Sequence, residues 1–341
     1  MTASKQNERE MKKIAVYGAG SWGTALALQL ARNGLDVLLW DFTPEHIAHY
    51  DKARENTHYL PGVPFPDNLR CTDSLEAMMA HADDQLIVIP SHGFRDLLKK
   101  LKPLLHADHA IFWATKGLEV GTGKLLHEVL IEEFGNDVPY GLVSGPTFAL
   151  EVAKGMPSAM TAAASTPELA ERIAAAFQGG NYRVYTSDDV LGVELGGAVK
   201  NVLAIAAGIS DGLGFGANAR AAIITRGLAE IMRLAKNMGA KDETIMGLAG
   251  VGDLVLTCTD NQSRNRRLGL ALGQGKDVDA AIEEIGQAVE GAKSSHCIGL
   301  LAERAGVEMP ICEAVHKVIY AGLEPRQAVK ELLGRQLKAE F

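Results

Sequence analysis

The sequence predicts an α/β protein in which a doubly wound, mostly parallel sheet forms an N-terminal domain and an all-α domain follows. Two observations support this prediction. Over the first half of the chain, short apolar runs alternate with segments of helical periodicity, as expected for repeated strand–helix units. Beyond residue 190 the helical periodicity continues, rich in Ala and Leu, without a convincing strand.

Length and composition agree with two domains. The chain has 341 residues, more than a usual single domain, and its 47% hydrophobic and 22% charged residues exclude a disordered or membrane class. We expect a flexible tail over residues 1–10, an α/β domain over 11–190 and a helical domain over 191–341. The charged N-terminus lacks an apolar core, and four scattered cysteines form no CxxC pair, so we expect reduced thiols in a cytoplasmic protein.

The first elements form a βαβ unit. KKIAVYGAG is a short β-rich run that ends in glycines, the helical pattern WGTALALQLARNG closes at Gly34, and DVLLW from Asp36 is a second strand. Two strands joined by a helix should be parallel, with a right-handed crossover. Later strand candidates, continuously apolar and so buried on both faces, are LIVIP (86–90), AIFWATK (110–116), YGLVSGP (140–146), SAMTAAA from Ser158 and YRVYT from Tyr182.

The first glycine turn carries a dinucleotide fingerprint. Gly18, Gly20 and Gly23 fit G-x-G-x-x-G between the first strand and the first helix, where a pyrophosphate can lie on the helix N-terminus. Asp41 follows the second strand, and an acid there can bond the adenosine ribose hydroxyls. The alternatives are an ordinary tight turn and a solvated acid. We therefore interpret residues 11–190 as a Rossmann-like, dinucleotide-binding domain.

One lysine lies in an unusual setting. LGGAVKNVLAIAAGI is apolar on every side except at Lys200 and Asn201, and the face of Lys200 carries only glycine, alanine and leucine. Such a desolvated lysine, with a second cation such as Lys116 nearby, has a lowered pKa and can act as a general base. The alternative is a lysine whose ammonium reaches solvent. The stretch from Leu195 to Ile209 is also too short to span a bilayer, so we predict no membrane insertion.

The segment GDLVLTCTDNQSRNRR (252–267) places Thr, Asn, Gln, Ser and three arginines together in a chain of net charge −8. A base, an acid to orient it and a basic, amide-rich anion site would serve a nicotinamide enzyme whose substrate carries a phosphate. Nucleic-acid binding is the alternative for the arginines, but they have no interleaved aromatic residues and no broad basic patch.

Several blocks, in order, resemble the bacterial NAD(P)-dependent sn-glycerol-3-phosphate dehydrogenases. They are GAGSWGTALA, ATKGLE, SGPTFA, GGAVKNV, SDGLGFGANARAAIITRGL, GDLVLTCTDNQSRNRR and VEG, and they extend over nearly the whole chain. The resemblance implies interconversion of dihydroxyacetone phosphate and glycerol 3-phosphate, which supplies phospholipid synthesis. It also implies NAD or NADP as cofactor, and the sequence does not rank the two.

The resemblance also implies site residues. Lys200 matches the proton acceptor, Lys116 a lysine that contacts cofactor and substrate, and Asp253 an acid beside the catalytic lysine. The other substrate positions matched are Gly145, Thr147, Ser263, Arg264 and Asn265, with Arg264 also reaching the dinucleotide. The cofactor positions matched are Ser21, Trp22, Ala149, Ala288 through its backbone, and Glu290. Asn201 and Thr257 match polar neighbours of the site in related eukaryotic enzymes.

Three alternatives stay open at this point. A β-hydroxyacid dehydrogenase or a ketopantoate reductase has the same two-domain plan, and a protein that only senses NAD(H) shares the fingerprint. No pattern calls for a metal. The apolar face of the segment from Ile224 is typical of a core or of a subunit interface, and we expect a homodimer.

Overall fold

The computed structural model describes residues 11–336, so the predicted tail over residues 1–10 lies outside the described residues. The chain divides into two compact units. Among the described residues, the N-terminal unit contains residues 11–116 and Leu126–Glu194, and the C-terminal unit contains Gly117–Leu125 and residues 195–336. Residues 117–125 thus belong to the C-terminal unit although the segments on either side belong to the N-terminal unit, and no local pattern in the sequence predicts this.

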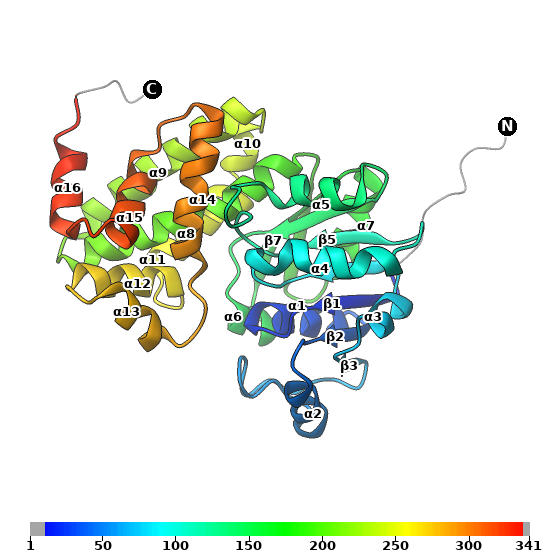
Figure 1. The fold of residues 1–341 in the computed structure, drawn as a ribbon. Coiled ribbons are helices and arrows are strands. Elements are labelled where there is room, and N and C mark those ends of the chain that lie inside the picture. The colour runs from blue at the N-terminus through cyan, green and yellow to red at the C-terminus, as the bar shows by residue number, and fades with distance from the viewer. Residues whose placement is uncertain (1–10, 337–341) are drawn as a thin grey trace. The chain divides into compact units, whose positions relative to one another are not determined.

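An eight-stranded sheet forms the centre of the N-terminal unit (Figure 1). Its order is β3-β2-β1-β4-β5-β6-β7-β8, and every neighbouring pair is parallel except β6 and β7. The predicted fold class, a doubly wound and mostly parallel sheet followed by helices, is confirmed. The strands are β1 (Lys13–Tyr17), β2 (Asp36–Trp40), β3 (Leu69–Thr72), β4 (Asp84–Ile87), β5 (Ala110–Trp113), β6 (Tyr140–Ser144), β7 (Ser158–Ala164) and β8 (Tyr182–Ser187).

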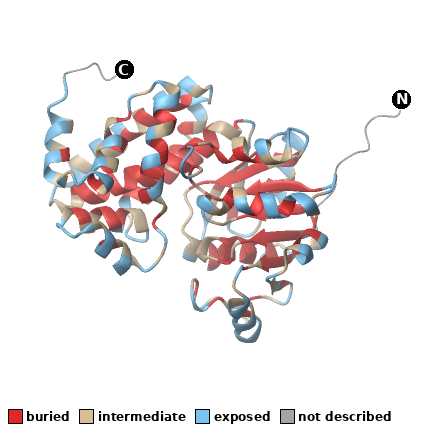
Figure 2. Ribbon diagram, in the orientation of Figure 1, coloured by how far each residue is buried: buried red, intermediate tan, exposed pale blue. Residues whose placement is uncertain are grey.

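Helices follow most of these strands and pack around the sheet. Figure 2 shows that the central strands are buried, as their continuous apolar sequences predict. The helices are α1 (Ser21–Arg32), α2 (Pro44–Ala53), α3 (Leu75–His81), α4 (Phe94–Leu101), α5 (Leu126–Phe134), α6 (Ala149–Ala153) and α7 (Pro167–Phe177), with 3-10 turns η1 (Ser91–Gly93) and η2 (Lys102–Leu104).

Two strand details differ from the sequence pattern. The strand β3 was not predicted, because LRCT is short and only its first residue is buried. The strand β4 begins two residues before the predicted apolar run, since Asp84 and Gln85 are buried with partners. Asp84 forms a 2.8 Å ion pair with Arg172, and Gln85 accepts a 2.5 Å hydrogen bond from the Tyr17 hydroxyl.

Within its described residues, the C-terminal unit consists of helices and the loops that connect them, and no strand is assigned there. The elements assigned from residue 190 onward are α8 (Val190–Gly212), α9 (Ala217–Met238), α10 (Asp242–Ile245), the π-helical turn η3 (Leu248–Gly252), α11 (Asp253–Thr259), α12 (Arg264–Gly273), α13 (Val278–Ile285), α14 (Glu290–Ala305), α15 (Pro310–Tyr320) and α16 (Pro325–Leu333). The helix α8 is longer than its apolar stretch suggests. Its 23 residues would suffice to cross a bilayer by length and composition, but 89% of its most apolar window is buried, as in a core helix.

Four glycines bring α8 and α12 into backbone contact. A Cβ atom on Gly208 would lie 2.1 Å from the Arg266 carbonyl oxygen, and one on Gly212 would lie 2.3 Å from that of Leu270. On the other helix, a Cβ on Gly269 would lie 2.0 Å from the carbonyl oxygen of Ile205, and Gly273 is equally restricted. Larger residues at these positions would force the helices apart. The glycines therefore set the spacing between the helix of Lys200 and the helix that begins at Arg264.

Candidate active site

The glycine turn before α1 has the shape that an anionic group needs. Gly18 has φ +112°, and a Cβ there would lie 2.7 Å from the Val88 carbonyl oxygen. A Cβ on Gly23 would lie 1.8 Å from the Gly18 carbonyl oxygen, whereas Gly20 borders open space, with no heavy atom within 4 Å of a Cβ. Gly20 immediately precedes α1, so this space lies beside the N–H groups of a helix N-terminus.

The next two residues hold the turn in place. The Ser21 hydroxyl donates a 2.9 Å hydrogen bond to the carbonyl of Tyr59. The Trp22 ring packs against the core of the N-terminal unit, and its indole nitrogen is buried without a partner among the described residues. Both side chains are thus directed toward protein, which leaves the backbone as the part of this turn that can meet a ligand.

Asp41 lies at the end of β2 and is not a solvated acid. It is 5% exposed, and its carboxylate accepts a 2.9 Å hydrogen bond from the backbone N–H of Thr43. The His46 ring nitrogen lies 3.4 Å from the other carboxylate oxygen. Phe42, by contrast, is 78% exposed. The carboxylate therefore stabilises the turn into α2, and its predicted contact with a ribose stays a prediction.

Lys116 and the segment after β6 lie at the carboxyl ends of adjacent strands. The Lys116 ammonium donates a 3.3 Å hydrogen bond to the Gly145 carbonyl, and the Thr147 hydroxyl donates a 3.2 Å bond to the same oxygen. Gly145 has no room for a side chain, because a Cβ would lie 2.7 Å from Cα of Met160. Ala149 begins α6. The predicted residues Lys116, Gly145 and Thr147 are thus brought together at the sheet edge where ligands of open α/β sheets bind.

Lys200 is the centre of a buried polar cluster in the C-terminal unit. It is 6% exposed, and its ammonium donates hydrogen bonds to the Asp253 carboxylate and, at 2.8 Å, to the Thr257 hydroxyl. Asp253 itself is 0% exposed at the first position of α11. The Thr257 hydroxyl donates in turn to the Asp253 carbonyl at 2.6 Å. Lys200 is therefore a buried, partnered lysine, and the solvent-reaching alternative is wrong.

Close helix packing explains why Lys200 and Asp253 meet. A Cβ on Gly196, one turn before Lys200, would lie 2.4 Å from the Ala249 carbonyl oxygen of η3. The π-helical turn therefore approaches α8 directly and leads into α11 at Asp253. Cys258 lies on the same helix, and burial raises the pKa of its thiol to about 12, against the smaller opposing effect of Lys200. The thiol stays protonated and is not a nucleophile at neutral pH.

The N-terminus of α12 brings together the predicted anion-binding residues. The Ser263 hydroxyl caps the helix by accepting a 3.2 Å hydrogen bond from the N–H of Arg266. The Arg264 guanidinium donates a 3.3 Å bond to the Gln287 side chain. A helix N-terminus with unbonded N–H groups and a nearby guanidinium is a favourable place for a phosphate.

Asn265 has a role that the sequence did not suggest. Its amide nitrogen donates a 2.9 Å hydrogen bond to the side-chain oxygen of Asn201, and its amide oxygen accepts a 2.9 Å bond from the Gly291 N–H. A Cβ on Gly291 would lie 2.6 Å from that amide oxygen, so VEG needs glycine here. Asn265 thus joins α8, α12 and the first turn of α14, which begins at Glu290. Ala288, just before α14, is exposed.

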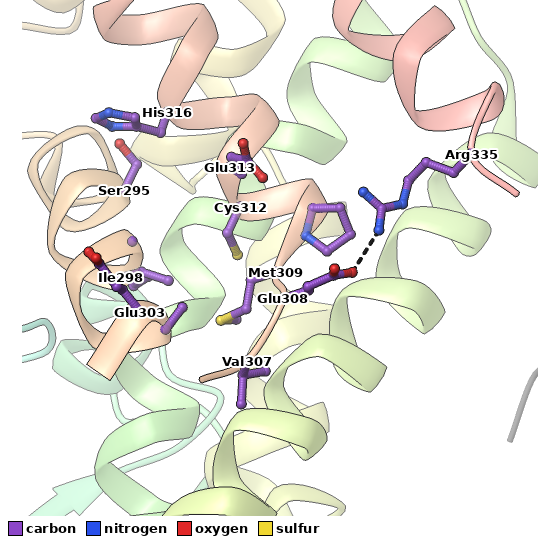
Figure 3. A pocket seen from close by; sticks show the side chains of 13 residues that line it. Ser295, Ile298, Glu303, Val307, Glu308, Met309, Cys312, Glu313, His316 and Arg335 are labelled. Carbon is purple, nitrogen blue, oxygen red and sulfur yellow. Dashed lines mark hydrogen bonds and ion pairs between the residues drawn. The ribbon is translucent and has the colours of Figure 1, made fainter. Parts of the chain in front are cut away.

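Two other features of the described residues lie apart from these predicted positions. A cavity of about 350 Å³ in the C-terminal unit is lined by α14, α15 and Arg335, which pairs with Glu308 at 2.8 Å (Figure 3). No predicted site residue lines it. In the N-terminal unit, Asp83, His106 and His109 lie within metal-ligand range of one another, but both ring nitrogens of His109 are hydrogen bonded to the backbone, which is typical of a core histidine.

The structure therefore forms two groups of predicted residues, one in each unit. Lys116 and Lys200 belong to different units, so the predicted pair of lysines stays a prediction. The sequence reasoning missed the bridging position of Asn265 and the buried position of Arg266. The only local signal for Asn265 was a polar side chain one residue beyond Arg264.

Comparison with known proteins identifies the family of both parts of the chain. Residues 13–170 match the family model described as the N-terminus of NAD-dependent glycerol-3-phosphate dehydrogenase, and residues 189–330 match its C-terminus. The chain is 58% identical over 328 residues to the NAD(P)+ glycerol-3-phosphate dehydrogenase of Thioalkalivibrio sulfidiphilus, covering 96% of this chain and 98% of the relative. It is 54% identical over 336 residues to that of Nitrosococcus oceani, covering 98% of each. The crystal structure of glycerol-3-phosphate dehydrogenase from Coxiella burnetii has a TM-score of 0.92 at 49% identity, covering 95% of this chain and 99% of that one.

Proposed function

Because the chain belongs to the NAD-dependent glycerol-3-phosphate dehydrogenase family, we propose that it interconverts dihydroxyacetone phosphate and sn-glycerol 3-phosphate with NAD or NADP. The observation that carries this proposal is the buried Lys200, bonded to Asp253 and Thr257, in the same unit as an anion-binding helix N-terminus. A base for an alcohol and a site for a phosphate are the two groups that this substrate requires.

The dinucleotide fits the N-terminal unit. The open space beside Gly20 and the N–H groups at the start of α1 suit its pyrophosphate, and a side chain at residue 20 would fill this cradle. When bound, the reduced nicotinamide supplies the hydride that reduces the C2 carbonyl. We assign contacts with the cofactor to Gly18, Gly20, Ser21, Trp22, Gly23, Asp41, Lys116, Ala149, Arg264, Ala288 and Glu290. We assign residues 11–190 as the dinucleotide-binding domain and residues 191–341 as the substrate and catalytic domain.

The substrate phosphate is assigned to the start of α12. Arg264 offers a charged donor, and Ser263 offers its hydroxyl proton while its oxygen caps the helix. The Asn265 amide is engaged with Asn201 and Gly291, so its contribution to the phosphate is its backbone N–H. Lys116, Gly145 and Thr147 complete the proposed substrate contacts.

Lys200 moves the proton. In reduction its ammonium gives a proton to the oxygen on C2, and in oxidation its amine takes the proton of the C2 hydroxyl. The hydrogen bonds to Asp253 and Thr257 fix the orientation of the Lys200 nitrogen, and the carboxylate stabilises its charged form. Lys200 and Asp253 are thus assigned as catalytic residues, and Lys116 as a second cation.

Initial rates with dihydroxyacetone phosphate and each reduced cofactor test the function directly. Lys200→Ala should keep cofactor binding and lose at least about a hundredfold in kcat, the lower end of general acid–base contributions. The exposed Lys236→Ala on α9 is the matched control and should turn over normally. Normal turnover by Lys200→Ala would remove the base. Cofactor binding without any turnover by the unaltered chain would favour the sensing alternative, and turnover of only an unphosphorylated ketone would favour the other dehydrogenases.

Cellular role and assembly are part of the same proposal. Glycerol 3-phosphate made in the cytoplasm would supply phospholipid synthesis, and we propose a homodimer. Light scattering of the purified chain tests the assembly, and a monomer at micromolar concentration would contradict it.

A further inference from the structure

Two charged side chains in the C-terminal unit lie at helix ends where the helix dipole disfavours their charge. Arg266 is in the first turn of α12, where a positive charge is unfavourable, and Asp211 is in the last turn of α8, where a negative charge is unfavourable. Their side chains are only 9% and 11% exposed, and the Arg266 guanidinium donates to the Asp211 carboxylate at 2.5 Å. The helix dipole disfavours the charge of both residues. The reason for their positions therefore lies in the contacts that their side chains make.

Arg266 makes three side-chain contacts with three different segments. Its Nε donates a 3.1 Å hydrogen bond to the Cys258 carbonyl, which lies in the last turn of α11 and lacks an intrahelical partner. One terminal nitrogen donates to the side-chain oxygen of Asn261, and the other donates to Asp211. The guanidinium therefore connects the end of α11, the following loop and the end of α8.

The loop that these contacts hold is the loop that leads into the proposed phosphate site. Only residues 260–263 separate α11 from α12. Within the loop, the Gln262 N–H donates 2.7 Å to the Asp260 carboxylate, and the Ser263 N–H donates 3.2 Å to the Asp260 carbonyl. At its far end, the Ser263 hydroxyl accepts from the Arg266 N–H. Residue 266 thus contacts the loop twice, through the Arg266 side chain at Asn261 and through its backbone N–H at Ser263.

Asp211 extends this connection to the helix of the proposed base. It accepts two hydrogen bonds from Arg220 at 2.9 and 3.0 Å as well as the bond from Arg266. Asp211 is on α8, about three helical turns beyond Lys200. One carboxylate therefore ties the α12 N-terminus to the helix that carries the base.

We propose that Arg266 is a positioning residue, which sets the phosphate-binding turn through Cys258, Asn261 and Asp211 and does not itself contact the substrate. The inference rests on the proposed function, and it separates Arg266 from Arg264 two residues earlier. Arg264 recognises the phosphate, whereas the charge of Arg266 is neutralised by Asp211. Loss of Arg266 displaces Ser263 and the Arg264 backbone, so binding of the phosphorylated substrate weakens while the proton transfer at Lys200 is retained.

The test compares Arg266→Met with Arg267→Met, because Arg267 is the adjacent, exposed arginine of the same helix. Arg266→Met should raise KM for dihydroxyacetone phosphate at least about tenfold and keep kcat within about threefold. Inhibition by inorganic phosphate should weaken by a similar factor. The rate with unphosphorylated dihydroxyacetone should not change, since that ketone has no phosphate to position. Arg267→Met should match the unaltered chain in all three measurements.

Two further variants separate an effect on positioning from an effect on stability. Asp211→Asn leaves the Arg266 charge buried without its carboxylate, whereas the double variant Asp211→Asn with Arg266→Met removes that charge as well. The double variant should have a higher thermal midpoint than Asp211→Asn and should still show the raised KM. It also keeps the test usable if Arg266→Met alone does not fold.

The possible outcomes are distinct. An unchanged KM in the folded Arg266→Met or double variant, or an equal loss of rate with both ketones, would overturn the positioning role. A loss of kcat without a change in KM would overturn it as well. Failure of the unaltered chain to reduce dihydroxyacetone phosphate would instead refute the proposed function. In that case, calorimetric measurement of inorganic phosphate binding would still test the effect of Arg266 on the anion site.

Discussion

The glycine contact between α8 and α12 predicts that the same substitution, glycine to alanine, changes the stability of the protein in opposite directions at Gly269 and at Gly299. Gly269→Ala places a Cβ atom 2.0 Å from the Ile205 carbonyl oxygen, a backbone atom that cannot rotate away. Gly299 is also within a helix, α14, but no heavy atom lies within 4 Å of a Cβ there. The two substitutions are chemically identical and differ only in this contact.

The magnitudes follow from the geometry. In a helix interior, alanine is more favourable than glycine by about 0.5–1 kcal/mol, so Gly299→Ala should stabilise the protein by that amount. Relief of the contact at Gly269 to an ordinary separation of about 3.4 Å requires the helices to move apart by about 1.4 Å, the difference from 2.0 Å. Overpacking of this kind costs about 1–3 kcal/mol, which outweighs the propensity gain. Gly269→Ala should therefore destabilise the protein.

Activity provides the second measurement, since α8 carries Lys200 and α12 carries Arg264. A shift of about 1 Å between catalytic and binding groups can lower a rate by about a hundredfold. Gly269→Ala should therefore lower kcat/KM for dihydroxyacetone phosphate, and Gly299→Ala should leave it unchanged. Urea unfolding followed by circular dichroism gives the stabilities. Equal stabilities and rates for the two variants would refute the assignment of the helix spacing to this contact.

Two further predictions concern single charges. Arg264→Ala should raise KM for dihydroxyacetone phosphate by about tenfold or more and weaken discrimination against dihydroxyacetone, because a charged hydrogen bond contributes about 1.5–3 kcal/mol. An unchanged KM in initial-rate measurements would remove Arg264 from the phosphate site. Glu230 accepts the backbone N–H of Ile311 at 2.7 Å, and burial raises its pKa from 4.5 to about 6, so its contribution to stability is present below pH 4.5 and is lost as the pH rises through 6. The side chain in Glu230→Gln does not titrate. The free energy of unfolding of this variant, relative to that of the unaltered chain, should therefore rise by about 2 kcal/mol between pH 4 and pH 7 in urea titrations. A difference between the two chains that does not change with pH would contradict the raised pKa.

The sheet was predictable where its strands are apolar and continuous. Runs such as AIFWATK are buried on both faces, so composition alone marks them as parallel strands. The strand β3 lacked this signal. The buried Asp84 and Gln85 of β4 are polar residues that pair with Arg172 and Tyr17, both distant in the sequence. A local pattern does not reveal such pairs. The grouping of residues 117–125 with the C-terminal unit escaped prediction for the same reason.

The candidate site was predictable in part from chemistry and in part only from resemblance. Lys200 was identifiable because a lysine on a helix face of glycine and alanine has no solvent to reach. Its partner Asp253 is 53 residues away and was suggested only by the family resemblance. The hydrogen bonds of Asn265 to Asn201 and to Gly291 join three helices. They depend on the close packing of those helices, which a sequence read segment by segment does not contain.

The cluster of arginines at 264–267 illustrates how helical geometry separates charges that are adjacent in sequence. Successive residues of a helix point about 100° apart, so these three side chains face different surroundings. Arg264 is half-buried beside Gln287, Arg266 is buried against Asp211, and Arg267 is exposed. The cluster therefore does not act as one basic patch on an acidic chain. Its first arginine is the one that we propose recognises a phosphate. Its second has its charge neutralised inside the protein, and its third remains in solvent, where salt screens it.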